Sequence, residues 1–474
     1  MNLSLSLTDM AALSPLWIIL VGALGSLLLE SFYEGFSKRW SHLIAFLTLL
    51  IAFIAAAYAP VSANPLLTPW VRFDPLARFF TLFFIGVGLG SVLLSRPFFQ
   101  RFTASRGEYY FFLQASVFGL ILIGAAADFL TLFIGLETLS VALYVWCGYM
   151  KEWGISKEAS IKYFITGAVA AAFLLYGFAF IYGAVGTTRL DHLLPAYGQL
   201  SDVKSHLLFM AGIAFVTVGL AFKAAVVPFH FWAPDVYYGA PTPVTAFMAV
   251  GTKAGAFAAF SVVFLEFLPH FNQLWNEGIA LLAYATLIYA NILALQQQQL
   301  RRFFAYSGIS HAGFLLIPLA AGTPNALPAT LFYLVVYALA TLGSFAVLAF
   351  LDESEEGVTM KDLKGLFRRS PALSFVLTIC LLTLAGIPPT AGFFAKFYVF
   401  IVAFQGGYYG LVIVGLLTAI LSAYYYLRIV TLMFSELPEE ETLLRTKSAS
   451  VLIALSILGI ALLSIDPNAL FYLF

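Results

Sequence analysis

The chain has 474 residues, of which 62% are hydrophobic and only 10% charged, and its 24 Lys plus Arg balance 24 Asp plus Glu. Soluble domains carry about 25% charged and about 45–50% apolar residues. This composition excludes a soluble enzyme, a disordered chain and a nucleic-acid-binding protein, and it favours a protein whose main solvent is a lipid bilayer.

Fourteen stretches reach the length of about 20 mostly apolar residues that a membrane-spanning helix needs. The predicted spans are 14–31, 41–60, 76–95, 109–127, 129–149, 160–184, 207–236, 243–265, 278–297, 303–322, 328–350, 372–402, 407–432 and 448–470. No basic flank or cleavage site accompanies the first stretch, so it is predicted to be a span rather than a removed signal. Runs such as 169–182 are apolar on every face, which excludes a barrel of alternating strands. We therefore predict an all-α polytopic membrane protein.

The basic residues of the loops separate strongly when successive loops are placed on alternate sides of the membrane. One side collects Lys38, Arg39, Arg96, Arg101, Arg106, Lys151, Lys157, Arg301, Arg302, Lys361, Lys364, Arg368, Arg369, Arg445 and Lys447. The other side receives only Arg72, Arg78, Arg189 and Lys204. Because Lys and Arg mark the cytoplasmic side, both termini are predicted outside, which means periplasmic for a bacterial inner membrane. The polar segment 352–370 is then predicted to be a cytoplasmic connection with an amphipathic stretch.

Two groups of five spans have matching spacing. The fourth to eighth spans begin near 109, 129, 160, 207 and 243, and the ninth to thirteenth near 278, 303, 328, 372 and 407. An odd number of helices in each unit gives the two units opposite orientations, which is the pattern of an inverted repeat. We predict an N-terminal three-helix segment (1–108), a first five-helix repeat (109–265), a second five-helix repeat (278–432) and a C-terminal helix (433–474).

The fourth span of each repeat is unusually long and is interrupted by proline, at Pro228 in the first repeat and at Pro388 and Pro389 in the second. Proline removes a backbone donor and clashes with the preceding turn, so each span is predicted to be a broken helix. Matched breaks in two repeats indicate a transport site. Proline kinks also serve purely architectural purposes, so the prolines alone leave both interpretations open.

Four ionisable residues lie inside predicted spans rather than at their ends: Glu137, Lys223, Lys253 and Lys396. Each charge at the centre of a membrane helix costs about 2.5–3.5 kcal/mol. Glu137 and Lys223 can relieve this cost by pairing, whereas Lys253 and Lys396 have no evident acidic partner. Because desolvation favours the neutral amine, we interpret the three lysines as groups that release and regain a proton.

The remaining candidate residues give weaker indications. His230 follows the first break and His311 lies in the tenth span, and each is either a proton carrier or a hydrogen-bonded buried histidine. His42, His192, His206 and His270 lie near loops and are assigned no role. Cys147 and Cys380 are too few for a four-cysteine metal or iron–sulfur site. No metal-ligand cluster, phosphate loop or dinucleotide motif is recognised, so no metal and no cofactor are predicted on this chain.

Four sequence stretches carry a resemblance to a known family. They are FLTLFIGLE at 129–137, PFHFWAPDVY at 228–237 with GAPTPV at 239–244, RFFAYSGISHAG at 302–313, and GIPPTAGFFAKFY at 386–398. With these motifs the chain resembles the antiporter-like membrane subunits of respiratory complex I, from roughly the third to the thirteenth span. One departure is Tyr238, which stands where an acidic residue would be expected.

The resemblance implies proton translocation within an NADH:quinone oxidoreductase. It implies that Glu137 pairs with Lys223 and that Lys253 and Lys396 carry the proton onward. NADH, FMN, iron–sulfur clusters and quinone are then expected on partner subunits, and homologous antiporter-like subunits are expected as membrane neighbours. Two alternatives remain open: a subunit of a cation/proton antiporter or membrane-bound hydrogenase complex, and a purely structural membrane subunit.

Overall fold

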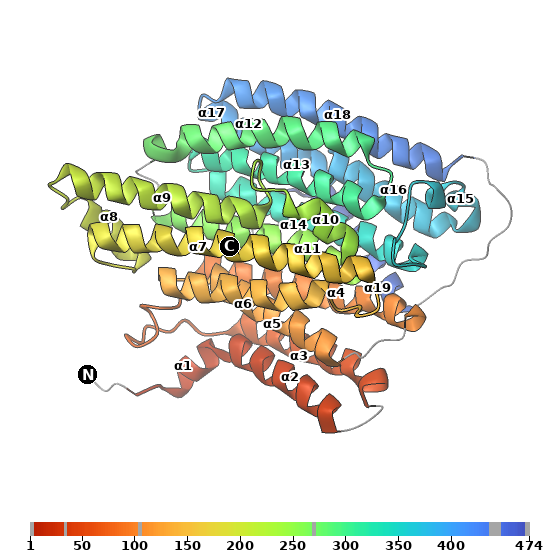
Figure 1. Ribbon diagram of the computed structural model, residues 1–474, viewed down its shortest axis with the longest axis horizontal. Helices are drawn as coiled ribbons and strands as arrows, with labels where there is room; N and C mark the ends of the chain where they lie inside the picture. The colour runs from red at the N-terminus through yellow and green to blue at the C-terminus, as the bar shows by residue number, and fades with distance from the viewer. Residues whose placement is uncertain (1–3, 33–35, 103–106, 268–271, 436–446, 470–474) are drawn as a thin grey trace.

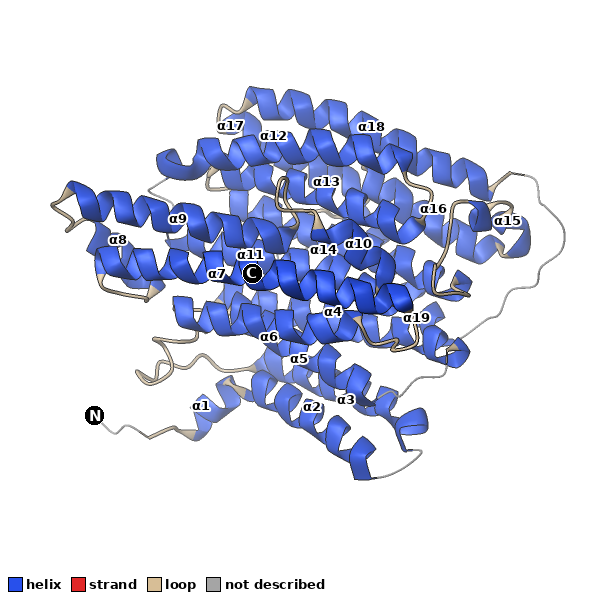
Figure 2. Ribbon diagram, viewed as in Figure 1, coloured by secondary structure: helices blue, strands red, loops and turns tan. Residues whose placement is uncertain are grey.

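The computed structural model describes residues 4–32, 36–102, 107–267, 272–435 and 447–469, and helices make up most of it (Figure 2). The N-terminal segment contains α1 (Leu7–Ala12), α2 (Ser14–Phe32), α3 (Phe36–Tyr58) and α4 (Pro75–Arg101). The first repeat region contains α5 (Gly107–Gly124), α6 (Phe129–Cys147), α7 (Gly154–Val185), α8 (Leu190–Tyr197), α9 (Val203–Ala224), α10 (Trp232–Gly239), α11 (Thr242–Phe260) and π-helical turns over Ser261–Phe267. The remainder contains α12 (Asn272–Gln296), α13 (Leu300–Ala321), α14 (Ala326–Leu351), a 3₁₀ turn (Lys361–Leu363), α15 (Leu366–Arg369), α16 (Pro371–Ala385), α17 (Ala391–Gln405), α18 (Tyr409–Met433) and α19 (Lys447–Ile465).

Every predicted span corresponds to helix. Within the described ranges, 12 helices are long and apolar enough to cross a membrane. The other two predicted spans are α19 and the pair α16–α17, whose two halves have 15 residues each. The chain is thus an all-α polytopic membrane protein, as predicted. The short helices α1 and α8 were not predicted, because neither is long enough to resemble a span.

Helix boundaries follow local capping chemistry. The carboxylate of Asp74 accepts a hydrogen bond from the Ala77 amide at the start of α4, and Asp128 caps the first turn of α6 in the same way. Such side chains satisfy amides that have no partner inside the helix. At the other end, α7 stops at Gly186, whose φ of 72° is accessible to glycine at little cost.

Hydrogen bonds between loops divide the connections into two groups, at opposite ends of the bundle (Figure 1). At one end, which we call the basic end, Arg101 donates to the Asp352 carbonyl, and Gln299 and Thr359 form a β-bridge. At the opposite end, bridges join Val71 to Ala126 and Asp128 to Arg189. Arg101 therefore lies at one end of the bundle, and Arg72 and Arg189 lie at the other, as the alternation of loops requires. Arg106, Arg445 and His270 fall outside the described residues, as do the side chains of Lys38, Arg39 and Lys447.

The segment after α14 closes the basic end with two short helical turns rather than one continuous helix. Leu363 and Leu366 are fully buried, while Lys361 and Lys364 are exposed. The predicted amphipathic stretch is therefore present. Asp352 is the first residue of an acidic loop, and such a residue would be expected to be exposed. It is only 1% exposed.

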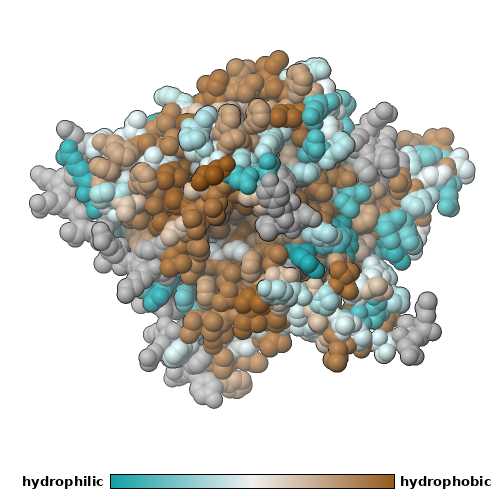
Figure 3. Space-filling view, turned by 180° about the vertical axis from the view of Figure 1, so that it is seen from behind, coloured by the Kyte–Doolittle hydropathy of each residue, from teal (hydrophilic) through white to brown (hydrophobic). Residues whose placement is uncertain are grey.

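Burial varies strongly among the spans. In the most apolar stretch of the spans Thr242–Phe267 and Leu300–Ala321, 94% of the residues are buried, whereas in Gly154–Val185 the share is 39%. Helices α11 and α13 therefore form the centre of the bundle, and α7 lies at its surface. One face of the molecule shows large apolar areas with smaller polar patches (Figure 3), as expected for a surface that contacts lipid or other membrane proteins.

Candidate functional site

The first predicted break lies between α9 and α10, around Pro228. The backbone leaves the helix at Ala225, which has a φ of 58°, and neighbouring side chains satisfy the freed polar groups. The Val227 amide donates to Thr286 Oγ1 at 3.1 Å, and Trp232 Nε1 donates to the Phe222 carbonyl at 2.9 Å. Non-helical backbone at membrane depth is tolerated when protein groups satisfy it in this way. The predicted break in this helix is therefore present, and the surrounding side chains stabilise it.

Lys223 occupies the last turn of α9, just before this break, with 4% of its side chain exposed. Its Nζ lies 3.8 Å from Glu137 Oε1 and donates a hydrogen bond to Ser140 Oγ on the same helix α6. The Tyr144 ring lies 5.8 Å from Nζ. The predicted Glu137–Lys223 pair is thus confirmed, and the C-terminal end of α9 adds a favourable dipole for the ammonium.

Glu137 is less buried than its partner, with 25% of its side chain exposed. It lies on an α6 face whose large apolar residues are exposed. They are Leu130, Ile134, Val141 and Val145. Its Oε1 atom is buried and accepts no hydrogen bond from the described residues. The carboxylate therefore joins the buried lysine to an apolar outer surface of the chain.

Lys253 is fully buried in the middle of α11. Its Nζ donates to the hydroxyl of Tyr237 on α10 at 2.8 Å and lies 4.9 Å from the centre of that ring. A Cβ added to Gly308 of α13 would lie 2.8 Å from Nζ and 3.0 Å from the Tyr337 hydroxyl. The absence of a side chain at Gly308 therefore makes room for the ammonium beside Tyr337. Among the described residues Lys253 forms no ion pair.

The second predicted break separates α16 from α17 and contains Pro388 and Pro389. Helix α16 ends at Ala385, and Gly386 follows with a φ of 79°. Lys396 of α17 reaches back across the break, and its Nζ donates to the Ala385 carbonyl at 2.7 Å and to Ser422 Oγ at 3.2 Å. The two breaks thus share one arrangement, in which a buried lysine sits at the C-terminal end of the first half-helix.

His311 lies between the two lysines that have no acidic partner. Its Nδ1 is hydrogen bonded to the Tyr333 hydroxyl at 2.8 Å, and its Nε2 to the Tyr426 hydroxyl at 3.2 Å. A small cavity of about 10 Å³ is lined by His311, Tyr337 and Lys396, which is room for about one water molecule. Tyr337 adjoins Lys253 through the space at Gly308, so the cluster runs from Lys253 to Lys396.

His230 is not part of this cluster. It lies in the first break, 3% exposed, with its ring 4.8 Å from the Tyr289 ring. Its Nδ1 accepts or donates no hydrogen bond among the described residues. The structure therefore brings together Glu137 with Lys223, and Lys253 with His311 and Lys396, and leaves His230 apart.

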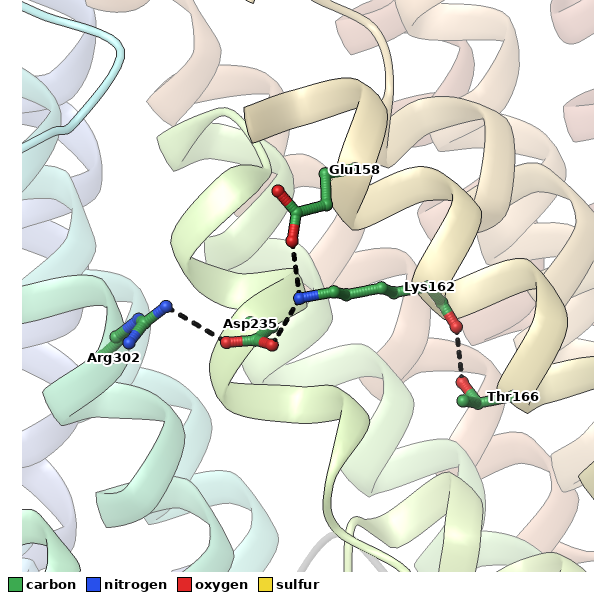
Figure 4. A network of polar contacts seen from close by, with 5 residues as sticks. All are labelled: Glu158, Lys162, Thr166, Asp235 and Arg302. Atoms are coloured by element: carbon green, nitrogen blue, oxygen red, sulfur yellow. Dashed lines mark hydrogen bonds and ion pairs between the residues drawn. The ribbon is translucent and has the colours of Figure 1, made fainter. Parts of the chain in front are cut away.

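A separate polar network links three helices toward the basic end (Figure 4). Lys162 of α7 contacts Glu158 at 2.6 Å and Asp235 of α10 at 2.7 Å, and Arg302 of α13 contacts the other oxygen of Asp235 at 3.1 Å. Tyr238, the departure noted in the sequence, lies with its ring 4.6 Å from the Arg302 guanidinium. The network ties the half-helix after the first break to both repeat regions.

A second cluster at the basic end was not predicted. The Arg301 guanidinium is 1% exposed and donates to the carbonyls of Ala240 at 2.6 Å and Glu355 at 2.5 Å. The buried Asp352 carboxylate accepts a hydrogen bond from Thr242 at the start of α11. Burial raises the pKa of Asp352, and the nearby Arg301 charge opposes that rise. These contacts hold the start of α11 against the ends of α13 and α14.

Other partners of the buried lysines and of His311 also escaped prediction. Ser140 could have been found, because it lies three residues after Glu137 and therefore on the same face of α6. Tyr237 stands in one of the motifs that carried the resemblance, yet its spacing does not show that it faces Lys253. Ser422 and Tyr426 have no distinguishing sequence context, since both lie in an apolar span.

Comparisons with known proteins show the family to which the chain belongs. The family model described as NADH:quinone oxidoreductase/Mrp antiporter, TM, matches residues 125–422. A protein named NADH-quinone oxidoreductase subunit N from Protochlamydia amoebophila (strain UWE25) is 61% identical over 469 residues, covering 98% of each chain. A chain of respiratory complex I from Thermus thermophilus with bound aureothin is 32% identical with a TM-score of 0.81, covering 96% of this chain and 98% of that one.

A chain of the Mrp complex from Dietzia sp. DQ12-45-1b has a TM-score of 0.85 at 20% identity and covers 98% of this chain and 96% of that one. At this identity the likeness shows a shared fold alone. The family model covers both NADH:quinone oxidoreductase subunits and Mrp antiporter subunits, and the relatives at higher identity belong to the first group. The chain therefore belongs to the NADH:quinone oxidoreductase/Mrp antiporter membrane family, as a proton-translocating membrane subunit of the NADH-quinone oxidoreductase subunit N type.

Proposed function

We propose that Glu137, Lys223, Lys253 and Lys396 are the groups that carry protons through this subunit. The observation that supports this most directly is the matched placement of Lys223 and Lys396 at the two breaks. Lys223 lies in the last turn of α9, and Lys396 donates to the last carbonyl of α16, so each is placed near a helix C-terminus, where the helix dipole favours positive charge. Each is also surrounded by apolar protein, where the neutral amine is favoured. These opposing influences suit a group that changes its protonation state during turnover.

Glu137 is proposed to control the proton affinity of Lys223. Moving one charge against 100 mV requires about 2.3 kcal/mol, and a hundredfold change in proton affinity corresponds to about 2.7 kcal/mol. Separating the carboxylate from the ammonium is a change of the required kind, since the pair lies 3.8 Å apart in a largely buried setting. A conformational or electrostatic signal from a neighbouring subunit would reach Glu137 first, because only this member of the pair is substantially exposed.

The route from Lys253 to Lys396 is proposed to pass His311. Tyr337 supports this route, because its hydroxyl borders the same space at Gly308 as Lys253 Nζ and its ring packs against His311 with centres 4.9 Å apart. The small cavity lined by His311, Tyr337 and Lys396 completes the route on the other side. The step from Lys223 to Lys253 needs another carrier, because no hydrogen bond among the described residues joins these two lysines. We propose that water enters between α9 and α11 when the Glu137–Lys223 pair opens. His230 is proposed to lie outside the main route, beside the first break.

We further propose the cellular setting. The excess of Lys and Arg at the basic end supports a cytoplasmic position for that end, with both termini periplasmic in a bacterial inner membrane. NADH, FMN, iron–sulfur clusters and quinone would be bound by partner subunits, and homologous antiporter-like subunits would be the membrane neighbours. The division into an N-terminal segment, two five-helix repeats and a C-terminal helix is retained as part of this proposal.

The test is proton pumping by the intact complex reconstituted into vesicles. Lys223→Met and Lys396→Met should each lower proton uptake coupled to NADH oxidation while the complex still assembles. Lys361→Met, at an exposed position in the loop of the basic end, is the matched control and should pump normally. Wild-type pumping in both buried variants would refute the proposal, and sodium-dependent transport without NADH oxidation would favour the antiporter alternative.

A further inference from the structure

A large groove lies toward the end of the bundle opposite the basic end, and none of the residues that line it belongs to the proposed relay. Its volume is about 570 Å³, and its lining includes Phe53 of α3, Phe79 and Phe83 of α4 and Val335 of α14. Pockets that bind small molecules typically measure about 300–1,000 Å³. The groove is therefore large enough for part of a lipid-sized molecule, and its walls are mainly apolar side chains.

The groove also reaches the level at which headgroups are expected. It is bordered by Asp74 and Pro75, the residues at which α4 begins, and by Val61 in the loop that follows α3. Trp70 of the same loop is 47% exposed. Exposed tryptophan and arginine side chains at helix ends mark the boundary between hydrocarbon and water. The groove thus runs from this boundary into the hydrocarbon region.

The charges at the mouth of the groove leave one cation without an acidic partner. Asp74 lies 2.9 Å from Arg72 Nε and also caps α4 through the Ala77 amide, so its charge is already compensated. Arg78 is exposed, lines the groove, and donates through Nη2 to the Ala59 carbonyl at 2.7 Å. Among the described residues no carboxylate forms an ion pair with Arg78. No hydrogen bond within the described part of the chain uses the other guanidinium donors of Arg78, so they are available to an anion.

We propose that this groove binds an anionic phospholipid, with its phosphate at Arg78 and one acyl chain along Phe53, Phe79 and Val335. Arginine recognises phosphate through charge-assisted hydrogen bonds, and the apolar walls match the chain below it. A free phosphate ion would leave the apolar walls without a partner, and an uncharged hydrocarbon would leave Arg78 unused. A bound lipid would fill the space between α3, α4 and α14, and so join the N-terminal helices to the second repeat region.

The proposal is tested on the intact complex, purified in detergent and stripped of lipid, by native mass spectrometry and thermal unfolding. When each lipid is added back, phosphatidylglycerol is expected to bind more tightly than phosphatidylcholine and to raise the unfolding temperature more. Arg78→Gln should weaken phosphatidylglycerol binding by about tenfold, the effect of one lost hydrogen bond to a charged group. Arg368→Gln, at an exposed site in the loop of the basic end, should leave binding unchanged.

A second variant tests the apolar part of the groove independently of the charge. Ala57→Phe places a ring in the groove from an exposed position of α3, where a larger side chain does not disturb the core. It should abolish retention of both lipids while proton pumping persists. Equal binding of phosphatidylcholine, unchanged binding in Arg78→Gln, or unchanged binding in Ala57→Phe would each overturn the proposal. Binding of glycerol phosphate as tight as that of phosphatidylglycerol would also overturn it, by showing an anion site without a lipid.

Discussion

Lys396 Nζ donates a 2.7 Å hydrogen bond to the main-chain carbonyl of Ala385, the last residue of α16. The lysine therefore satisfies an acceptor that the broken helix would otherwise leave without a partner. A side chain from the second half of the helix thus secures the end of the first half. The position of the Lys396 ammonium and the geometry of the break are linked by this contact.

The first prediction follows from that bond. Lys396→Met removes the donor, leaves the Ala385 carbonyl buried without a partner, and should cost about 1–3 kcal/mol of stability in addition to the pumping defect. Thermal unfolding of the purified complex measures the loss of stability, and vesicle assays measure the pumping. Lys361→Met should change neither quantity, because its side chain is exposed. An unchanged unfolding temperature in Lys396→Met would show that the bond contributes little to stability.

The second prediction distinguishes a relay from a structural ion pair at Glu137. Glu137→Gln keeps the shape of the side chain and removes its charge, so it should reduce proton pumping without preventing assembly. Glu356→Gln, an exposed acid near the basic end, should leave pumping unchanged. If Glu137→Gln lowers the unfolding temperature and pumping per assembled complex stays normal, the structural interpretation of the pair is correct.

The third prediction concerns the space that Gly308 leaves for Lys253. In Gly308→Ala the new Cβ would lie 2.8 Å from Lys253 Nζ, so the flexible end of the lysine must move away from position 308. Pumping should fall, while stability should stay the same or rise by up to about 1 kcal/mol because alanine favours helix. Gly278→Ala in α12 has open space around its Cβ and should pump normally. Full activity in Gly308→Ala would mean that the position of Lys253 is not critical.

The fourth prediction tests the buried cluster at the basic end. Asp352→Ala leaves the Thr242 hydroxyl without its acceptor and removes a negative charge near buried Arg301. It should lower the free energy of unfolding by about 1–3 kcal/mol. Glu353→Ala is the matched control, since its side chain is 73% exposed and its contact with Arg101 is long, at 3.6 Å. The free energy of unfolding of both variants is measured by denaturation. If Asp352→Ala and Glu353→Ala lose the same amount, Asp352 has no special role.

Much of the fold could be predicted from the sequence, because spans, breaks and buried charges depend on properties that each residue carries by itself. Fourteen apolar stretches and the prolines of two long spans were enough to place the helices and their breaks. The pairing of Glu137 with Lys223 was also predictable, since an isolated charge in this setting is costly.

The contacts of Lys253 and Lys396 could not be predicted in the same way. Lys396 binds a main-chain carbonyl, and every residue has one, so the sequence contains no signal for Ala385 as its partner. Lys253 depends on the missing side chain of Gly308, and glycines inside membrane spans commonly serve close helix packing instead. The burial of Asp352 escaped prediction for a related reason, because its neighbours in the loop are exposed while its own carboxylate is buried.

The enclosure of α11 has a consequence for how the chain is made. This helix packs against α13 and α14, which are synthesised later, and 94% of the residues in the most apolar stretch of its span are buried in the folded chain. During synthesis Lys253 therefore enters the membrane before its permanent neighbours exist. A chain truncated before α13 would leave this lysine facing lipid or water, so the first half of the protein reaches its final structure only when the second half has been inserted.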